Sequence, residues 1–223
     1  MLILAIDTAL DACAAAVLDT SANKMLAQES QAMKRGHAEA LMPLIARVMK
    51  ESGIAFDALD RVASTTGPGS FTGLRVGLSA ARGIALAAGK PVVGLTTLTA
   101  YAAPVVAENG EYPIISAIDA RHDHVYFQVV SGNGSPLIKP QVAPIAEVLD
   151  ASRFGTPHLV GNAARILADR WLAGSTTAVP PPHHCENHVV MTPVAAQRWR
   201  AGPLAAWRQA RVDNTALPAS SPD

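Results

Sequence analysis

The segment TTGPGSFTGLRVG, residues 65–77, connects a short apolar stretch to a long stretch with helical character. The residues Arg61–Thr65 predict a strand, and those after the glycines predict a helix that runs to about Ala88. A glycine turn between a strand and a helix presents free N–H groups at the positive end of the helix dipole, where an anion binds well. The same turn also serves as a tight connection without a ligand, and both interpretations stay open at this point.

The segment does not match the standard phosphate-binding motifs. The P-loop motif, G-x-x-x-x-G-K-[ST], requires a lysine that neutralises phosphate, whereas Gly73 is followed here by Leu74. The motif G-x-G-x-x-G does not fit either, because one residue too many separates Gly69 from Gly73. What remains is a glycine turn into a helix, without a lysine for phosphate.

The predicted helix carries small residues at every fourth position of one face, namely Gly73, Gly77, Ala81 and Ala85. Small side chains let another element approach the helix closely. Glycine inside a helix is about 1 kcal/mol less favourable than alanine, so Gly77 indicates a packing constraint. This face packs either against the core of the chain itself or against a second subunit.

Length and charge limit the classes of function. The chain has 223 residues, enough for one large domain or two small ones, and 49% of them are hydrophobic. Its 18 basic and 18 acidic side chains give zero formal charge. A protein that binds nucleic acid alone usually has a basic excess, so we expect contact with RNA only through a partner.

The sequence predicts a cytoplasmic protein without a membrane segment. The start MLILAIDT is too short for a signal peptide and lacks a basic leader. No apolar run reaches the roughly 20 residues that a membrane span needs. Of the two cysteines, Cys13 lies in a small apolar run and is expected to fill the core.

The order of elements predicts an α/β fold made of two similar halves. Apolar runs predict strands near residues 1–6, 14–18 and 24–29, followed by a helix at about His37–Lys50. After the glycine segment, GKPVVGL predicts a short strand, and Thr96 or Thr97 is expected to cap the next helix. The stretch ISAID at 115–119 then repeats ILAID at 3–7. Further strands are expected at 124–130 and 137–142, and residues 158–172 predict strand, glycine turn and helix.

Candidate sites for metal or nucleotide are few. Asp7 and Asp119 each follow an apolar strand and suit a magnesium–nucleotide complex, although Asp119 suits an ion pair with Arg121 equally well. The first loop, DTALDACAAAV, has no glycine to wrap phosphate. A metal pair on a helix needs histidines four residues apart, but Leu41 stands four residues after His37. The run HHCENH at 183–188 lacks zinc-finger spacing, so we expect no metal site.

Several motifs together resemble the TsaB/YeaZ family. They are ILAIDTA, RGHAEALMPLI, TTGPGSFTGLRVGLSAARGIALA, PVVGLTTLTAYA and AIDARHDHVYFQVV, and they cover about residues 1–170. The resemblance implies an α/β fold of the actin/Hsp70/sugar-kinase superfamily with duplicated RNase H-like halves. We expect an N-terminal half at 1–110, a shorter half at 111–175, and a Pro-rich linker with a divergent tail at 176–223, which includes a helix returning to the first half.

The resemblance also implies a function in tRNA modification. Family members are non-catalytic subunits that pair with a TsaD-like catalytic subunit, which transfers threonylcarbamoyl to adenosine 37 (t6A) of tRNAs reading ANN codons. A TsaE-like ATPase works with them, tRNA is contacted only through the complex, and the subunit forms a homodimer when alone. No cofactor is required, and weak ADP or ATP binding is expected. The alternatives are a self-sufficient ATP-binding kinase or hydrolase of the same superfamily, a glycoprotease-like peptidase, and a structural homodimer.

The family pattern assigns residues to two sites, a subunit interface and a residual nucleotide-binding site. Within the subunit interface, the substitution Gly77→Leu is expected to break the contact with the partner and leave the fold intact. The subunit interface is expected at Leu41, Leu44, Ile45, Val48, Gly73, Leu74, Val76, Gly77, Ala80 and Ala81. Residual nucleotide binding is expected at Asp7, Thr8, Gly67, Gly69, Ser70 and Thr72.

Overall fold

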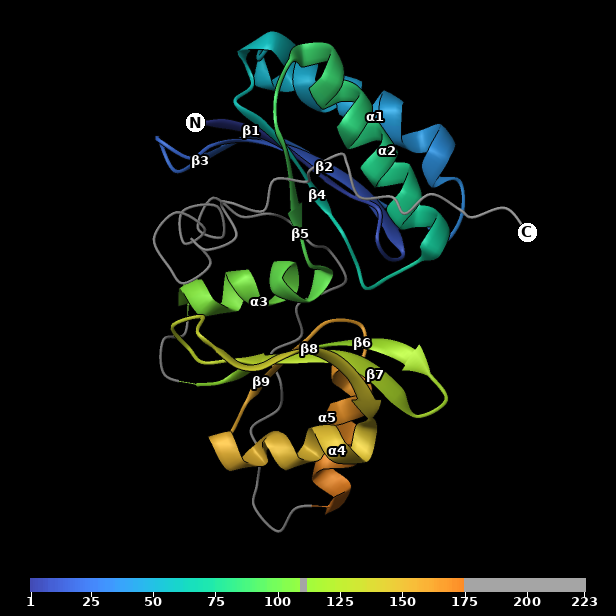
Figure 1. The fold of residues 1–223 in the computed structure, drawn as a ribbon, viewed down its shortest axis with the longest axis vertical. Helices are drawn as coiled ribbons and strands as arrows, with labels where there is room; N and C mark the ends of the chain where they lie inside the picture. Colours follow the sequence, from blue (N-terminus) through green and yellow to red (C-terminus); the bar gives the residue numbers. More distant parts are fainter. Residues whose placement is uncertain (109–111, 175–223) are drawn as a thin grey trace, which may run out of the picture.

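The computed structural model describes residues 1–108 and 112–174, which form two lobes, each built on its own β-sheet (Figure 1). The first sheet has the strand order β3-β2-β1-β4-β5, and the second has the order β8-β7-β6-β9. The strands of the first sheet are β1 (Leu2–Asp7), β2 (Ala12–Asp19), β3 (Lys24–Ala32), β4 (Arg61–Thr65) and β5 (Val92–Leu95). Those of the second are β6 (Ile114–Arg121), β7 (His124–Val130), β8 (Pro136–Pro144) and β9 (His158–Val160).

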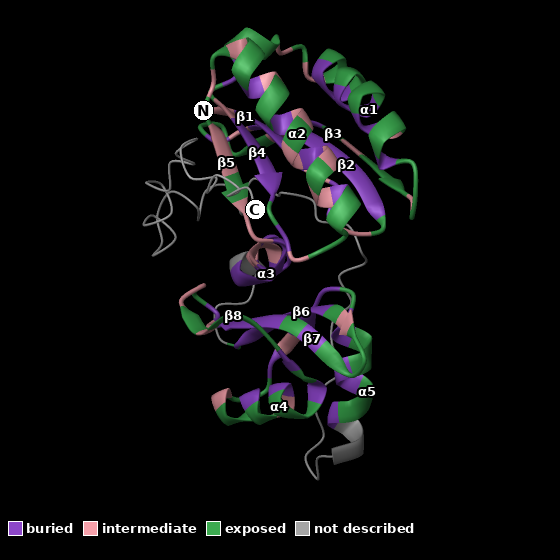
Figure 2. Cartoon of the chain, turned by 45° about the vertical axis from the view of Figure 1, so that its right-hand side comes forward, coloured by how far each residue is buried: buried purple, intermediate pink, exposed green. Residues whose placement is uncertain are grey.

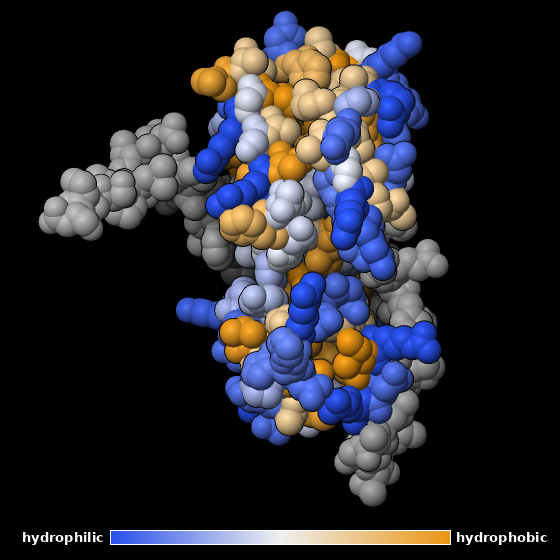
Figure 3. Space-filling view, turned by 90° about the vertical axis from the view of Figure 1, so that its right-hand side faces the viewer, coloured by the Kyte–Doolittle hydropathy of each residue, from blue (hydrophilic) through white to orange (hydrophobic). Residues whose placement is uncertain are grey.

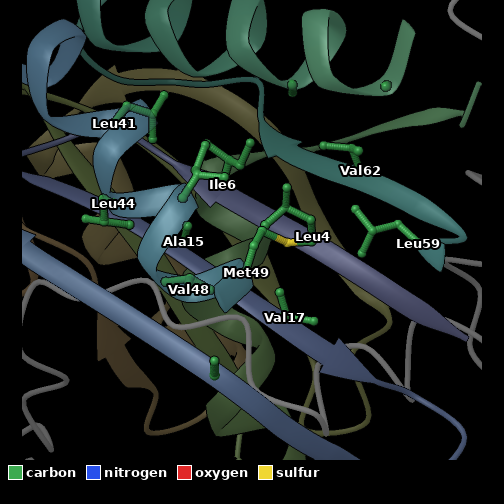
Figure 4. Packing of buried hydrophobic residues seen from close by; sticks show 14 of the residues in the cluster. Leu4, Ile6, Ala15, Val17, Leu41, Leu44, Val48, Met49, Leu59 and Val62 are labelled. Atoms are coloured by element: carbon green, nitrogen blue, oxygen red, sulfur yellow. The ribbon is translucent and has the colours of Figure 1, made fainter. Parts of the chain in front are cut away.

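In the first lobe, two helices cover one face of the sheet (Figure 1). These are α1 (His37–Ser52) and α2 (Phe71–Ala88), and a short 3-10 helix, η1 (Phe56–Ala58), precedes β4. Strands β1 to β3 form an antiparallel meander, whereas β4 and β5 run parallel to β1. The core between sheet and helices includes Leu4, Ile6, Ala15, Val17, Leu41, Leu44, Val48, Met49, Leu59 and Val62 (Figure 4).

The second lobe repeats this arrangement on a smaller scale. Its strands β6, β7 and β8 form an antiparallel meander, and β9 runs parallel to β6. The helices α4 (Ile145–Leu149) and α5 (Ala164–Gly174) pack on one face of this sheet, and a 3-10 helix, η2 (Asp150–Phe154), follows α4. The predicted internal repeat is therefore present in the strand order of the two sheets.

Helix α3 (Thr97–Glu108) lies between the two lobes (Figures 1 and 2). Thr96 caps this helix, because its hydroxyl accepts a hydrogen bond from the N–H of Thr99 at 3.1 Å. Thr96 is one of the two residues predicted as the cap. Buried side chains of α3, such as Leu98 and Val105, pack against Ile114 and Ile118 of β6. The helix thus belongs to the first half by sequence and shares its core with the second sheet.

Strand β2 is buried along almost its whole length. This burial explains why its sequence, ACAAAVLD, is rich in small side chains. Cys13 lies within it and has no exposed surface. Burial raises the pKa of its thiol to about 11, so the group stays protonated and unreactive near neutral pH. Its predicted role as a core residue is confirmed. Among the described helices, none is both long and apolar enough to cross a membrane.

The face of small residues on α2 packs against the chain's own first strand. A Cβ atom added at Gly73 would lie 2.1 Å from the Thr8 carbonyl oxygen, and one added at Gly77 would lie 2.4 Å from the Thr8 hydroxyl. Ala81 and Ala85 are buried in the first-lobe core. Of the two interpretations of this face, the structure shows packing against the chain itself. The expectation that Gly77→Leu leaves the fold intact is wrong, because no space exists for a side chain there.

Two glycines of α2 provide a matched pair of variants. Gly77→Ala should lower the free energy of unfolding by about 1–3 kcal/mol, since its methyl group overlaps Thr8 and forces α2 outward. Gly83→Ala should raise it by up to about 1 kcal/mol, because Gly83 has open space around it and alanine favours the helix. Urea unfolding of both variants measures the difference. Equal stabilities would show that α2 does not approach β1 this closely.

Candidate functional site

The most enclosed carboxylate of the first lobe lies where β1 and β4 end side by side. Asp7 is the last residue of β1, and Thr65 is the last residue of the parallel strand β4. The Asp7 carboxylate accepts the Thr65 hydroxyl at 2.6 Å and the Ala9 N–H at 3.1 Å. Burial nevertheless raises the pKa of Asp7 above its ordinary value, since the loss of water outweighs these hydrogen bonds. Hydrogen bonds within the chain hold the Asp7 carboxylate in place, and its charged form lowers the stability of the fold.

The glycine segment forms a closed turn against the start of the β1–β2 connection. Its Ser70 N–H donates to the Ala9 carbonyl oxygen at 2.7 Å, and the Ser70 hydroxyl accepts the Gly73 N–H at 3.2 Å as the N-cap of α2. A Cβ atom added at Gly69 would lie 2.3 Å from the Ala9 carbonyl oxygen. The geometry therefore favours a tight connection over an anion-binding turn, because the N–H groups of Ser70 and Gly73 already have hydrogen-bond partners within the chain.

The residues predicted for residual nucleotide binding have internal roles. The Thr8 hydroxyl donates to the Gly73 carbonyl oxygen at 2.7 Å, and the Gly67 carbonyl oxygen accepts the Thr97 N–H at 2.8 Å. Thr72 is exposed on α2. Weak ADP or ATP binding at these residues stays a prediction.

His37 lies at the start of α1 and is buried. Its Nε2 atom is 3.1 Å from the Leu10 carbonyl oxygen, so this nitrogen donates a hydrogen bond within the chain. Leu41, one turn later, fills the first-lobe core. Across the described residues, 1–108 and 112–174, no group of three or more His, Cys, Asp or Glu side chains is arranged to hold a metal ion. The HHCENH run lies outside these residues.

The corresponding position in the second lobe differs from the first. Asp119 is exposed, and its carboxylate accepts the backbone N–H of Arg121 at 2.8 Å. Asp119 and Arg121 are thus joined by a backbone hydrogen bond and not by the predicted ion pair. The next turn is tight, with positive φ angles of 66°, 52° and 60° at Arg121, His122 and Asp123. Asp119 therefore shapes a turn at the surface, whereas Asp7 is enclosed.

Most of the residues predicted for the subunit interface lie beneath the surface. The ten predicted residues divide into two groups. Leu74, Val76 and Ala80 are half-buried on the flanks of α2. Leu41, Leu44, Ile45, Val48, Gly73, Gly77 and Ala81 are buried within the first lobe. A second protein cannot touch this buried group without opening the core, so their role as direct contacts needs correction to one of support.

The outer side of these helices carries apolar residues that the sequence analysis missed. Phe71 is 68% exposed and Leu86 is 85% exposed on α2, and Met42 on α1 is 50% exposed. The Arg75 guanidinium stacks over the Phe71 ring at 3.8 Å. We call Met42, Phe71 and Leu86 the outer helical face. In the space-filling view, apolar side chains form an orange and tan area on the upper lobe between hydrophilic residues (Figure 3). Helical periodicity could have found Phe71 and Leu86, since both lie away from the face of small residues.

Comparison with solved structures and curated proteins indicates the family. The structure described as YeaZ from Pseudomonas aeruginosa superposes with a TM-score of 0.69 at 26% identity, covering 91% of this chain and 93% of that one. The protein of Haemophilus influenzae named tRNA threonylcarbamoyladenosine biosynthesis protein TsaB is 36% identical over 57% of this chain and 53% of its own length. Its Escherichia coli counterpart is 37% identical over 57% and 54%. The match spans about half the length of these curated relatives.

A family model described as TsaD, tRNA N6-adenosine threonylcarbamoyltransferase, matches residues 20–200. The chain belongs to this threonylcarbamoyltransferase family, within its TsaB/YeaZ group. The predicted TsaB/YeaZ resemblance and the α/β fold of the actin/Hsp70/sugar-kinase type are confirmed. The two curated relatives are named for threonylcarbamoyladenosine biosynthesis on tRNA.

Asp7 gives this TsaB/YeaZ-group chain a testable dependence of stability on pH. The folded state holds the Asp7 proton more tightly than the unfolded chain does, so the charged carboxylate destabilises the fold at neutral pH. Asp7→Asn keeps the oxygen that accepts from Thr65 and Ala9 but carries no charge. Its free energy of unfolding should exceed that of the unmodified chain above the folded-state pKa. The gain should shrink as the pH falls and vanish below the ordinary value of an aspartate.

Urea unfolding between pH 3 and pH 8 measures this difference. Asp119→Asn is the matched control, because Asp119 occupies the corresponding strand end in the second lobe and is exposed to water. Its variant should show a much smaller change across the same range. A gain for Asp7→Asn that does not vary with pH would contradict the assignment of a costly buried charge.

Proposed function

We propose that this chain is the non-catalytic subunit that pairs with a TsaD-like catalytic subunit for threonylcarbamoylation of adenosine 37 in tRNAs reading ANN codons. Its family membership and the names of its TsaB relatives support a place in t6A synthesis. The aligned region also matches a tRNA N6-adenosine threonylcarbamoyltransferase of Novosphingobium aromaticivorans at 35% identity over 51% of this chain and 39% of that protein. A subunit and its partner of similar fold would explain both matches.

The outer helical face is the observation that carries the proposal. Met42, Phe71 and Leu86 expose half or more of their surfaces on two neighbouring helices of one lobe. Apolar and aromatic side chains together with arginine are typical of the central part of protein interfaces. The pair of Phe71 and Arg75, stacked at 3.8 Å, presents both kinds of group at one point. The rigid, buried core beneath the helices would hold this face in a fixed shape.

The interior of the first lobe supports a non-catalytic role. The Asp7 carboxylate, the His37 imidazole and the Thr8 hydroxyl each make hydrogen bonds within the chain. These hydrogen bonds hold the three side chains in place within the chain, in keeping with a role other than contact with a substrate. We further propose that tRNA and a TsaE-like ATPase meet this subunit only within the complex, in keeping with its zero formal charge. No cofactor of its own is needed for this role.

A charge placed on the outer helical face should disrupt pairing. Phe71→Glu is expected to weaken binding to the TsaD-like subunit at least about tenfold, since it removes a large apolar contact and buries a charge. Stability should change by no more than about 0.5 kcal/mol, because the side chain is 68% exposed. Leu137→Glu on β8, where the side chain is 41% exposed in the second lobe, is the matched control and should bind normally. Calorimetric titration measures both affinities.

The same variants distinguish this proposal from its alternatives. Normal binding of Phe71→Glu, or an equal loss for Leu137→Glu, would remove the outer helical face as the contact surface. Sedimentation velocity of the isolated chain tests the homodimer, which we expect to use the same face and to be weakened by Phe71→Glu. ATP hydrolysis by the isolated chain would instead favour the self-sufficient kinase or hydrolase.

A further inference from the structure

Four consecutive residues at the end of β1 tie together the elements of the first lobe. Each of the four residues makes a hydrogen bond to a residue that is distant in the sequence. Asp7 accepts from Thr65 of β4, Thr8 donates to Gly73 of α2, Ala9 accepts from Ser70 of the glycine segment, and Leu10 accepts from His37 of α1. We call Asp7–Leu10 the β1 junction. It connects β4 to both helices that carry the outer helical face.

Within the β1 junction, Thr8 has the tightest contact with α2. Its side chain is 1% exposed, and its hydroxyl lies 2.7 Å from the Gly73 carbonyl oxygen. The same hydroxyl occupies the space that a Cβ atom of Gly77 would need, at 2.4 Å. Thr8 therefore fills a notch formed by two successive turns of α2. The depth at which α2 sits on the sheet is set at this contact.

The hydroxyl group is required for this contact, and the shape of the side chain is not sufficient. A valine at position 8 has nearly the same shape but turns a methyl group toward the Gly73 carbonyl oxygen. That oxygen would then lose a buried hydrogen bond and face a group that cannot donate one. Because the Gly73 and Gly77 backbone leaves no spare room, α2 can relieve the contact only by moving away from β1.

We propose that Thr8 is a positioning residue for partner binding, which fixes the first two turns of α2 and with them Phe71 on the outer helical face. Thr8 itself is buried and touches no partner. This inference rests on the proposed function, since the affinity it controls is that for the TsaD-like subunit. It assigns to the Thr8 hydroxyl a role in pairing, in place of the nucleotide contact expected from the sequence.

The test compares three variants of the full chain. Thr8→Val removes the hydroxyl, Thr8→Ser keeps it, and Val125→Ala destabilises the second lobe by truncating a fully buried residue far from α2. Calorimetric titration gives the affinity of each for the TsaD-like subunit, and urea unfolding gives its stability. Amide hydrogen exchange across residues 71–78 reports how firmly α2 is held. Thr8→Val should bind about tenfold more weakly and exchange faster, as expected for the loss of one buried hydrogen bond.

The controls separate positioning from general stability. Thr8→Ser and Val125→Ala should both bind within about threefold of the unmodified chain, with unchanged exchange in residues 71–78. Unchanged binding by Thr8→Val, or a loss for Val125→Ala that follows its stability, would overturn the proposal. If the unmodified chain does not bind the partner, the proposed function fails. The role of Thr8 in pairing then fails with it, and exchange still shows whether Thr8 holds α2, which equal exchange in Thr8→Val and the unmodified chain would refute.

Discussion

The close approach of α2 to the end of β1 is the constraint on which the first lobe depends. Gly73 and Gly77 have no side chains, so the helix backbone comes within hydrogen-bonding distance of Thr8. The glycine segment must then turn sharply between β4 and α2, and Gly69 lies against the Ala9 carbonyl oxygen for the same reason. Two N–H groups that could bind an anion in an open loop, those of Ser70 and Gly73, are used to close this turn. Packing of the strand on the helix thus decides the character of the segment.

The polar and apolar groups of the first lobe point in different directions. Its polar residues Asp7, Thr8 and His37 form hydrogen bonds within the chain and hold the β1 junction together. Its outward helices expose Met42, Phe71 and Leu86. An enzyme site, in contrast, needs a few polar groups that are free to contact a substrate. This contrast agrees with the role of a partner subunit that we propose for this member of the threonylcarbamoyltransferase family.

The repeated fold could be predicted from the sequence because it rests on local patterns. Apolar runs that end in Asp7 and Asp119 mark corresponding strands, and helical spacing marks α1 and α2. Residues 175–223 lie outside the described residues, so the predictions for that segment stay predictions. The expected division at residue 110 falls between α3 and β6, although α3 shares its core with the second sheet.

The details of the site depend on contacts between distant segments. Periodicity showed that Gly73 and Gly77 share a face with Ala81 but not which neighbour fills it, and that neighbour is Thr8, 65 residues before Gly73. The environment of Asp7 depends on the parallel pairing of β1 with β4, which brings Thr65 beside it. The predicted interface residues were assigned from the family pattern to two helices, and the apolar positions of a helix mark the core as readily as a contact surface.

The most direct test of the account is the yield of threonylcarbamoyladenosine in tRNA, measured by mass spectrometry in a reconstituted mixture. The mixture contains the TsaD-like subunit, the TsaE-like ATPase, the enzyme that makes the threonylcarbamoyl donor, ATP and tRNA. The account predicts that the yield collapses when this chain is left out and returns in proportion to the amount added, up to one chain per TsaD-like subunit. An unchanged yield without the chain would contradict its role as the required partner.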